Sequence, residues 1–232
     1  MTGWVRAAPE DTVQGAAPGT VALALIGANG PAMWEAFAAA PEYGDARPHP
    51  MDRWSRRVIG RAACALSAKA HFPFGGPPYR PFLTWAMAAE GAVSSPLGMV
   101  VTPERGLMAS WRGALAFRHV PDGAAGGLGD EPQGCVGGGG KGAGRGTGGA
   151  ATSGVPCAEC FRPCADACPV GAFADGGFDP GRCRAHLSSA AGAPCREGGC
   201  IARSACPLSL DLPQAERAFH LAAFHRSSAT GA

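Results

Sequence analysis

The feature that most constrains this chain is a concentration of cysteine near its C-terminal end. The sequence has 232 residues and 10 Cys, and eight of these Cys fall in one short segment. So dense an array indicates a role for sulfur in metal binding or cross-linking rather than in ordinary packing. The eight residues are Cys157, Cys160, Cys164, Cys168, Cys183, Cys195, Cys200 and Cys206.

The spacing of these cysteines divides them into two groups of four, each ending in a Cys-Pro pair. A four-iron cluster needs one thiolate at each iron atom, so two groups of four suit two such clusters. The two groups read Cys157-x2-Cys160-x3-Cys164-x3-Cys168-Pro169 and Cys183-x11-Cys195-x4-Cys200-x5-Cys206-Pro207.

Zinc, disulfides and a redox-active pair each account for the cysteines less well. Structural zinc favours two compact CxxC pairs or Cys/His mixtures, whereas the only CxxC here joins Cys157 and Cys160. A disulfide framework needs an oxidising compartment. A redox-active CxxC would use two cysteines and leave six without a role. Iron-sulfur clusters are therefore favoured, with zinc and disulfides as the alternatives.

Residues 157–173, which read CAECFRPCADACPVGAF, and the later GGCIARSACP at 198–207 resemble the bacterial-type dicluster ferredoxins. The family pattern is C-x2-C-x2-C-x3-C-P. This chain departs from it by one residue inserted before Cys164 and by a longer second motif. The resemblance implies two [4Fe-4S] clusters that relay single electrons, with a redox partner protein.

In two-cluster ferredoxins the Cys that precedes Pro ligates the other cluster. The resemblance therefore implies a crossed ligand set and no general acid, base or nucleophile in this segment. Phe161, Phe173, Phe178 and Ile201 are expected to exclude water. The first cluster is assigned to Cys157, Cys160, Cys164 and Cys206, and the second to Cys168, Cys183, Cys195 and Cys200.

The two cysteines outside the array carry no metal in this interpretation. Cys64 is expected to be a small buried residue of a helix. Cys135 lies in a Gly-rich stretch without neighbouring thiols, and it is expected to be a free surface cysteine.

Composition along the chain predicts four regions of an α+β protein. Residues 1–19 are a flexible lead-in, and residues 20–120 form a mixed domain. Residues 121–155 are a Gly-rich linker that lets the next module move, because they cannot bury enough apolar surface to order themselves. Residues 156–232 form a ferredoxin-like domain that ends in a helix over residues 213–225.

Local patterns predict several elements. Residues 21–26 read as a buried strand, followed by a turn at 27–31 and a helix to residue 40. A second helix begins with Asp52 as its N-cap, and its four arginines form either a solvated basic face or, less favoured, an anion site. Further expectations are a rigid loop at 71–79, a helix at 81–90, strands at 97–101 and 114–117, and a short hairpin formed by 170–173 and 177–179.

The segments ALALIGANGPAMWEAF, HPMDRW and SPLGMVVTPERGLMASWRGALAF are similar to the cobalamin-processing chaperone family of the CblC type. The resemblance covers residues 20–120 and implies an α/β flavin-reductase-like core, here shorter than in the family. It places Arg112 near a cobalamin or flavin pocket beside the loop at 72–79. The alternative for Arg112 is a local salt bridge.

The order of the two modules resembles that of epoxyqueuosine reductases and reductive dehalogenases. The favoured function is nevertheless an electron carrier rather than a catalyst. The alternative is a corrinoid- or flavin-dependent reductase, an oxidoreductase that uses the clusters as its internal electron donor.

Charge and hydropathy narrow the partners and the location. The formal net charge is +2, and no block of Lys and Arg indicates a nucleic-acid partner. The longest apolar run, at residues 21–27, is too short to span a bilayer. Without a secretory signal, the chain is expected in the cytoplasm, where thiols stay reduced.

Overall fold

The computed structural model describes residues 3–7, 11–28, 30–121, 157–173 and 177–217. The N-terminal part holds β1 (Trp4–Arg6), β2 (Ala22–Gly27), α1 (Gly30–Ala38), α2 (Pro41–Gly44), α3 (Pro50–Ala65), β3 (Lys69–His71), α4 (Phe82–Glu90), β4 (Val93–Ser94), β5 (Val100–Val101) and β6 (Trp111–Phe117). The C-terminal part holds α5 (Pro163–Asp166), α6 (Pro180–Ser188), η2 (Ala190–Gly192), α7 (Ala193–Gly198), α8 (Ile201–Ser204) and η3 (Pro207–Ser209).

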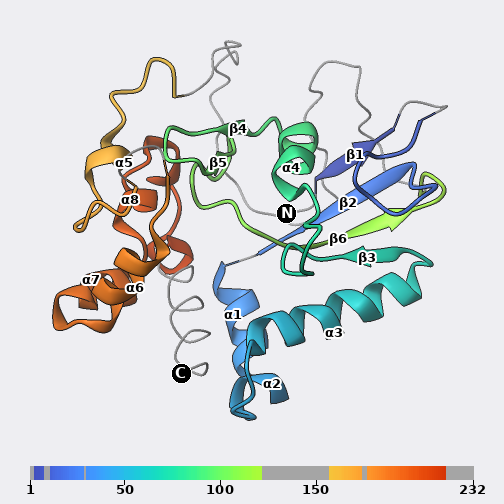
Figure 1. Ribbon diagram of the computed structural model, residues 1–232, viewed down its shortest axis with the longest axis horizontal. Helices are drawn as coiled ribbons and strands as arrows, with labels where there is room; N and C mark the ends of the chain where they lie inside the picture. Colours follow the sequence, from blue (N-terminus) through green and yellow to red (C-terminus); the bar gives the residue numbers. More distant parts are fainter. Residues whose placement is uncertain (1–2, 8–10, 29, 122–156, 174–176, 218–232) are drawn as a thin grey trace, which may run out of the picture.

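The N-terminal part is built on a four-stranded sheet with the order β1-β2-β6-β3 (Figure 1). Each described strand pair in it is antiparallel, and Leu23 of β2 lies opposite Ala116 of β6. Helices pack beside this sheet, so the expected mixed α+β class is confirmed. The buried strand predicted at residues 21–26 is β2, whose residues 22–25 are almost completely buried.

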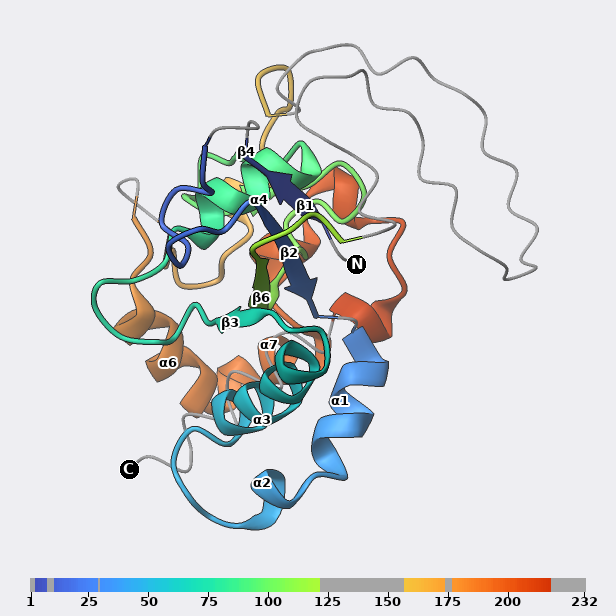
Figure 2. The ribbon, with the colours of Figure 1, turned by 90° about the vertical axis from the view of Figure 1, so that its right-hand side faces the viewer.

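Alternation along β2 and β6 gives the sheet two apolar faces, because successive side chains of a strand point to opposite sides. One face packs against Phe82 and Trp85 of α4, and the other against Ile59 and Ala63 of α3. Figure 2 shows the strands between these two helices. The strand residues on the α4 side are Leu23, Leu25, Ala114 and Ala116, and those on the α3 side are Ala22, Ala24, Leu115 and Phe117.

The start of the chain differs from the expected flexible lead-in over residues 1–19. Its described residues include β1, which pairs with β2. Val5 and Val13 are buried in the core on the α4 side. The indole N–H of Trp85 donates a hydrogen bond of 2.9 Å to the carbonyl of Gln14. Single apolar residues spaced among Gly, Pro and Ala therefore anchor this stretch to the sheet.

The second helix begins earlier than expected. α3 starts at Pro50, which suits the first turn of a helix because the missing N–H would have no partner there. Asp52 is therefore not the N-cap, and its carboxylate binds Arg112 instead. Cys64, near the end of this helix, is exposed, so the expectation that it is buried is wrong. Cys135 lies outside the described residues.

The remaining local expectations are met in part. The helix at 81–90 is α4, and the strand at 114–117 is the end of the longer β6. Of residues 97–101, only 100–101 form a strand, and the loop expected from residue 71 begins after β3. The expected hairpin forms no strand in its described residues. The predicted helix at 213–225 lies mostly outside the described residues.

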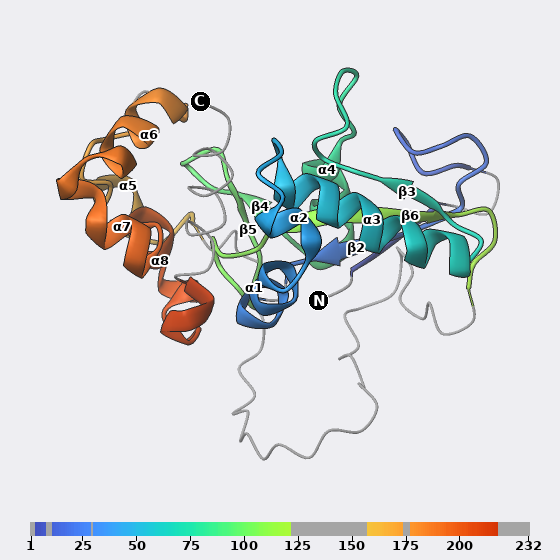
Figure 3. The ribbon, with the colours of Figure 1, turned by 90° about the horizontal axis from the view of Figure 1, so that it is seen from below.

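The cysteine-rich part packs directly against residues 93–109 of the N-terminal part. Leu97, Val101 and Leu107 form one apolar cluster with Cys164 and Cys206. Figure 3 shows α5 and α8 at one end of the molecule, beside β4 and β5. The described part of the module is thus docked rather than held apart. Most of the expected linker, residues 122–155, lies outside the described residues.

Polar contacts reinforce this junction. The side chain of Ser209 is completely buried. Its hydroxyl accepts a hydrogen bond of 3.1 Å from the N–H of Leu107 and donates one of 3.2 Å to the carbonyl of Arg105. Arg105 also forms an ion pair of 2.6 Å with Glu216. Buried backbone groups of residues 105–107 therefore find partners in the cysteine-rich part.

Substitution of Gly106 tests how tightly the junction is packed. Gly106 has a φ of +52°, and a Cβ atom there would lie 2.5 Å from the hydroxyl oxygen of Ser209. Gly98 has a φ of +69° with open space around it. Gly98→Ala should cost about 1–2 kcal/mol from backbone strain alone, whereas Gly106→Ala should cost a further 1–3 kcal/mol or so from overpacking. Urea unfolding of both variants measures the difference, and equal losses would contradict the tight junction.

Candidate functional site

The first group of cysteines lines a cavity of about 330 Å³ at the junction of the two parts. Cys157 and Cys160 come from the loop before α5, and Cys164 lies within α5. Leu107 of the N-terminal part and Leu208 also border the cavity. The four cysteines of the lining are Cys157, Cys160, Cys164 and Cys206.

Local backbone structure sets these positions. Arg162 has a φ of 56°, in the left-handed region, and Pro163 then opens α5. The N–H of Arg162 lies 3.3 Å from the sulfur of Cys160 and donates a hydrogen bond to it. The chain therefore bends sharply between Cys160 and Cys164, so that both residues border one cavity.

The second group gathers around α6 and α7. Cys183 lies on α6, Cys195 on α7, and Cys200 directly before α8. Cys195 and Leu187 form a small buried cluster, against which Cys183 and Cys200 pack. α6 is fixed at its start by Asp179, whose carboxylate accepts a hydrogen bond of 2.9 Å from the N–H of Arg182.

The two Cys-Pro pairs are exchanged between the groups. Cys168 follows α5, yet it is close enough to Cys183, Cys195 and Cys200 to interact electrostatically with all three. Cys206 follows α8, yet it borders the first cavity. α5 and α8 pack side by side (Figure 3), so each helix delivers its following cysteine to the other group. The structure thus brings together the same two sets of four that the ferredoxin resemblance implied.

Burial and mutual repulsion disfavour the charged form of these thiols. Burial, followed by nearby Cys206, raises the pKa of Cys157 and of Cys164. Burial, followed by Cys200, raises the pKa of Cys183 and of Cys195. Four thiolates gathered in one place therefore need a positively charged centre to offset their repulsion. The donor set fits an iron-sulfur cluster in this respect, since its ligands are thiolates.

The cysteines are not spaced for a single metal ion. Within the described ranges, no three His, Cys, Asp or Glu side chains form a group that could hold one ion. A zinc ion with Zn–S bonds of about 2.3 Å brings its sulfur ligands within roughly 4 Å of one another. Ligands of a four-iron cluster bind separate iron atoms, so they need not surround a single point. The nine described cysteines are free thiols.

The expected shielding by aromatic residues is only partly present. Phe173 stacks on Phe178 with ring centroids 5.0 Å apart. Phe161 is 85% exposed, so it does not exclude water, and Phe178 and Ile201 are also exposed. Residues of the N-terminal part cover the first group instead, chiefly Leu97, Val101 and Leu107. Their role could not be predicted from the sequence, because they lie far from the cysteines along the chain.

Arg203 is another residue whose role the sequence did not reveal. Its guanidinium donates hydrogen bonds of 2.5 Å to the carbonyl of Leu107 and 3.0 Å to that of Ala109. Burial lowers its pKa to about 10, and nearby Cys200 acts in the opposite direction. The side chain therefore stays charged at neutral pH. It links the second group of cysteines to the N-terminal part.

Arg112, the residue assigned to a corrinoid or flavin pocket, is occupied by internal contacts. It forms an ion pair of 2.5 Å with Asp52 and a hydrogen bond of 3.1 Å with the hydroxyl of Ser55. Its guanidinium also lies 4.9 Å from the ring centroid of Phe74. These contacts are those of a local salt bridge, the alternative that the sequence left open. A cofactor role for Arg112 stays a prediction.

Comparison of the chain with protein-family models, with curated proteins and with solved structures finds no significant match. In the described part of the chain, no helix has both the length and the apolar character needed to cross a bilayer.

Arg203→Met should weaken the attachment of the cysteine-rich part, because it leaves two buried carbonyls without their charged donor. We expect a loss of about 2–4 kcal/mol in the free energy of unfolding. Arg196→Met is the matched control, since Arg196 donates to the carbonyls of Leu187 and Ser189 within the module. Urea denaturation compares the two variants. A loss for Arg203→Met no larger than for Arg196→Met would contradict the linking role.

Proposed function

We propose that this chain is an iron-sulfur electron-transfer protein of the dicluster ferredoxin type, which holds two [4Fe-4S] clusters. One observation carries the proposal: the eight cysteines gather in two sets of four, and each set includes the Cys-Pro cysteine of the other motif. Zinc sites or disulfides do not require such an exchange. It is the ligand pattern of two-cluster ferredoxins.

The residues of the chain would support such clusters in two ways. Backbone N–H groups of Arg162 and Ala172 donate to the sulfurs of Cys160 and Cys168 at 3.3 Å each. Hydrogen bonds to sulfur and the degree of solvent exposure both tune reduction potentials. Leu97, Val101 and Leu107 limit water around the first set. A bound cluster of this kind accepts and releases single electrons.

The proposed role is that of a carrier that meets a redox partner protein, not of a catalyst. The described lining of the first cavity contains Glu159 but no His, so it offers no His–carboxylate pair for bond chemistry. We place the carrier in the cytoplasm, where thiols stay reduced and able to bind iron. The reductase alternative depends on a cofactor beside Arg112, whose contacts with Asp52 and Ser55 do not favour it.

Paired cysteine substitutions test the exchange. Cys157→Ser with Cys206→Ser removes two ligands of one proposed cluster, whereas Cys157→Ser with Cys168→Ser removes one ligand of each. After anaerobic reconstitution, the wild type should hold about eight irons per chain, and the first double variant about four. The second double variant should retain clearly fewer, because both clusters are damaged. Cys64→Ser is the control and should keep the full iron content.

Iron and sulfide analysis, with EPR of the reduced proteins, measures these outcomes. Equal iron in the two double variants would contradict the exchanged ligands, and a wild type without iron would overturn the proposed function. Visible absorption adds a separate criterion. Corrin or flavin bands beside the broad cluster absorption would favour the reductase instead.

A further inference from the structure

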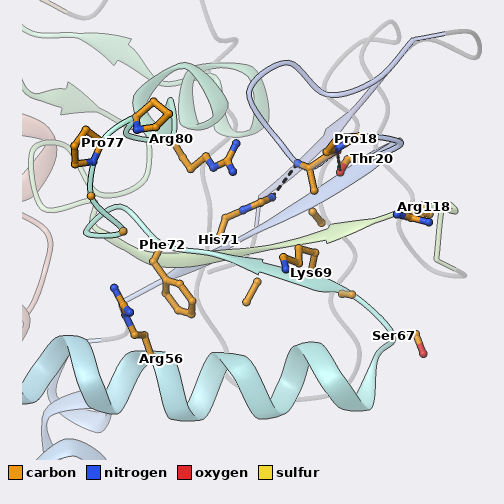
Figure 4. Close-up of a pocket in the computed structure, with 17 residues that line it drawn as sticks. Pro18, Thr20, Arg56, Ser67, Lys69, His71, Phe72, Pro77, Arg80 and Arg118 are labelled. Atoms are coloured by element: carbon orange, nitrogen blue, oxygen red, sulfur yellow. Dashed lines mark hydrogen bonds between the residues drawn. The ribbon is translucent and has the colours of Figure 1, made fainter.

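A second hollow lies on the N-terminal part, at the edge of the sheet formed by β3. It encloses about 850 Å³, within the range of small-molecule sites. Its walls come from Arg56 of α3, from the residues between α3 and β3, from β3, from the loop before α4 and from the segment that precedes β2 (Figure 4). The cysteine-rich module lies at the other end of the molecule (Figures 1 and 3).

Four cationic side chains line this hollow, and each comes from a different segment. They are Arg56 of α3, Lys69 of β3, Arg80 before α4 and Arg118 after β6. Among the described residues that line it, there is no Asp or Glu. All four cations are exposed, and no carboxylate of the described lining balances their positive charge. A pocket lined by charges of one sign attracts a ligand of the opposite sign.

Two other arginines of α3, unlike Arg56, are paired with acids. Arg53 forms an ion pair of 2.6 Å with Asp45, and Arg57 forms one of 2.5 Å with Glu42. The hydrogen bond from Arg57 lowers the pKa of Glu42 to about 2, so this pair stays charged. Arg56 instead lies over the rings of Phe72 and Phe74, at 5.8 and 5.5 Å from their centroids. The guanidinium of Arg56 therefore lies at the hollow, and no carboxylate among the described residues pairs with it.

The floor of the hollow is fixed by His71, which is 5% exposed. Its Nε2 accepts a hydrogen bond of 3.1 Å from the N–H of Ala17, the dashed line in Figure 4. Burial, followed by the charges of Arg80 and Lys69, lowers the pKa of His71 to about 4. A neutral His71 at physiological pH preserves this hydrogen bond. Arg80 is fixed as well, since it donates at 2.8 Å to the carbonyl of Gly15.

The same lining offers apolar surface beside the charges. Ala17, Ala70, Phe72 and the consecutive prolines Pro77 and Pro78 all contribute to it. An inorganic anion would use only the cations and would leave most of this volume unfilled. A ligand that joins several negative charges to a planar, largely apolar body would use both kinds of surface.

We propose that this hollow binds a nucleotide-sized phosphate ester. The phosphate oxygens contact cationic side chains of the lining, among them Lys69 and Arg118, because guanidinium and ammonium groups form charge-assisted hydrogen bonds to phosphate. The body of the ligand packs on Phe72 and the prolines. The proposal depends only on residues of the N-terminal part, so it stands or falls independently of the iron clusters.

Calorimetric titration of the full-length protein with ADP tests this proposal, with adenosine as the uncharged comparison. ADP should bind at least about tenfold more tightly than adenosine, since several charge-assisted contacts are lost with the phosphates. High salt should weaken ADP binding because it screens the cations. Equal affinity for ADP and adenosine, or no binding of ADP at millimolar concentration, would overturn the proposal.

Variants locate the site. Lys69→Gln and Arg118→Gln should each weaken ADP binding about tenfold, the loss expected for one charged contact. Arg61→Gln is the matched control, because Arg61 is an exposed arginine of α3 that does not line the hollow. Its ADP affinity should equal that of the wild type. An equal loss in all three variants would show that ADP responds only to net charge, and would overturn the assigned site.

Discussion

The relative position of the two parts of this molecule depends on the hydrogen bonds that the backbone of residues 105–109 makes. This loop is largely buried, and buried backbone N–H and C=O groups need partners. Ser209 and Arg203 supply them from the cysteine-rich part, through the N–H of Leu107 and the carbonyls of residues 105, 107 and 109. Neither part would bury this surface alone. The cysteine groups are therefore held at a defined place on the N-terminal part.

Elements governed by local pattern could be predicted from the sequence. The buried strand β2 and the helical spacing of Phe82, Trp85 and Ala86 in α4 both appear in the structure. The two sets of cysteines are those that the ferredoxin resemblance implied, because in that family the Cys before Pro belongs with the other motif. Features that depend on distant partners could not be predicted. β1 is stabilised by pairing with β2, and β3 by pairing with β6, although their own sequences are too short to indicate strands.

The two ends of the molecule differ in the charge that they carry. At one end, thiols gather in two sets, and burial, followed by neighbouring cysteines, raises the pKa of Cys164 and of Cys183. A positively charged centre would offset this cost. At the other end, Arg56, Lys69, Arg80 and Arg118 surround a hollow whose described lining has no carboxylate. Arg53 and Arg57 of α3 are paired with acids, whereas Arg56 of the same helix lines the hollow. The sheet and its two apolar faces hold these ends apart.

The departure from the ferredoxin spacing is accommodated by the backbone around Arg162. One extra residue separates Cys160 from Cys164, and a longer loop would ordinarily move the second sulfur away from the first. Arg162 adopts a φ of 56°, which turns the chain back, and Pro163 starts α5 immediately afterwards. A left-handed conformation is unfavourable for a residue with a side chain, so surrounding structure must hold it. The hydrogen bond from its N–H to the Cys160 sulfur is one such constraint. The insertion is thereby absorbed in the turn, and Cys164 remains buried beside Cys206.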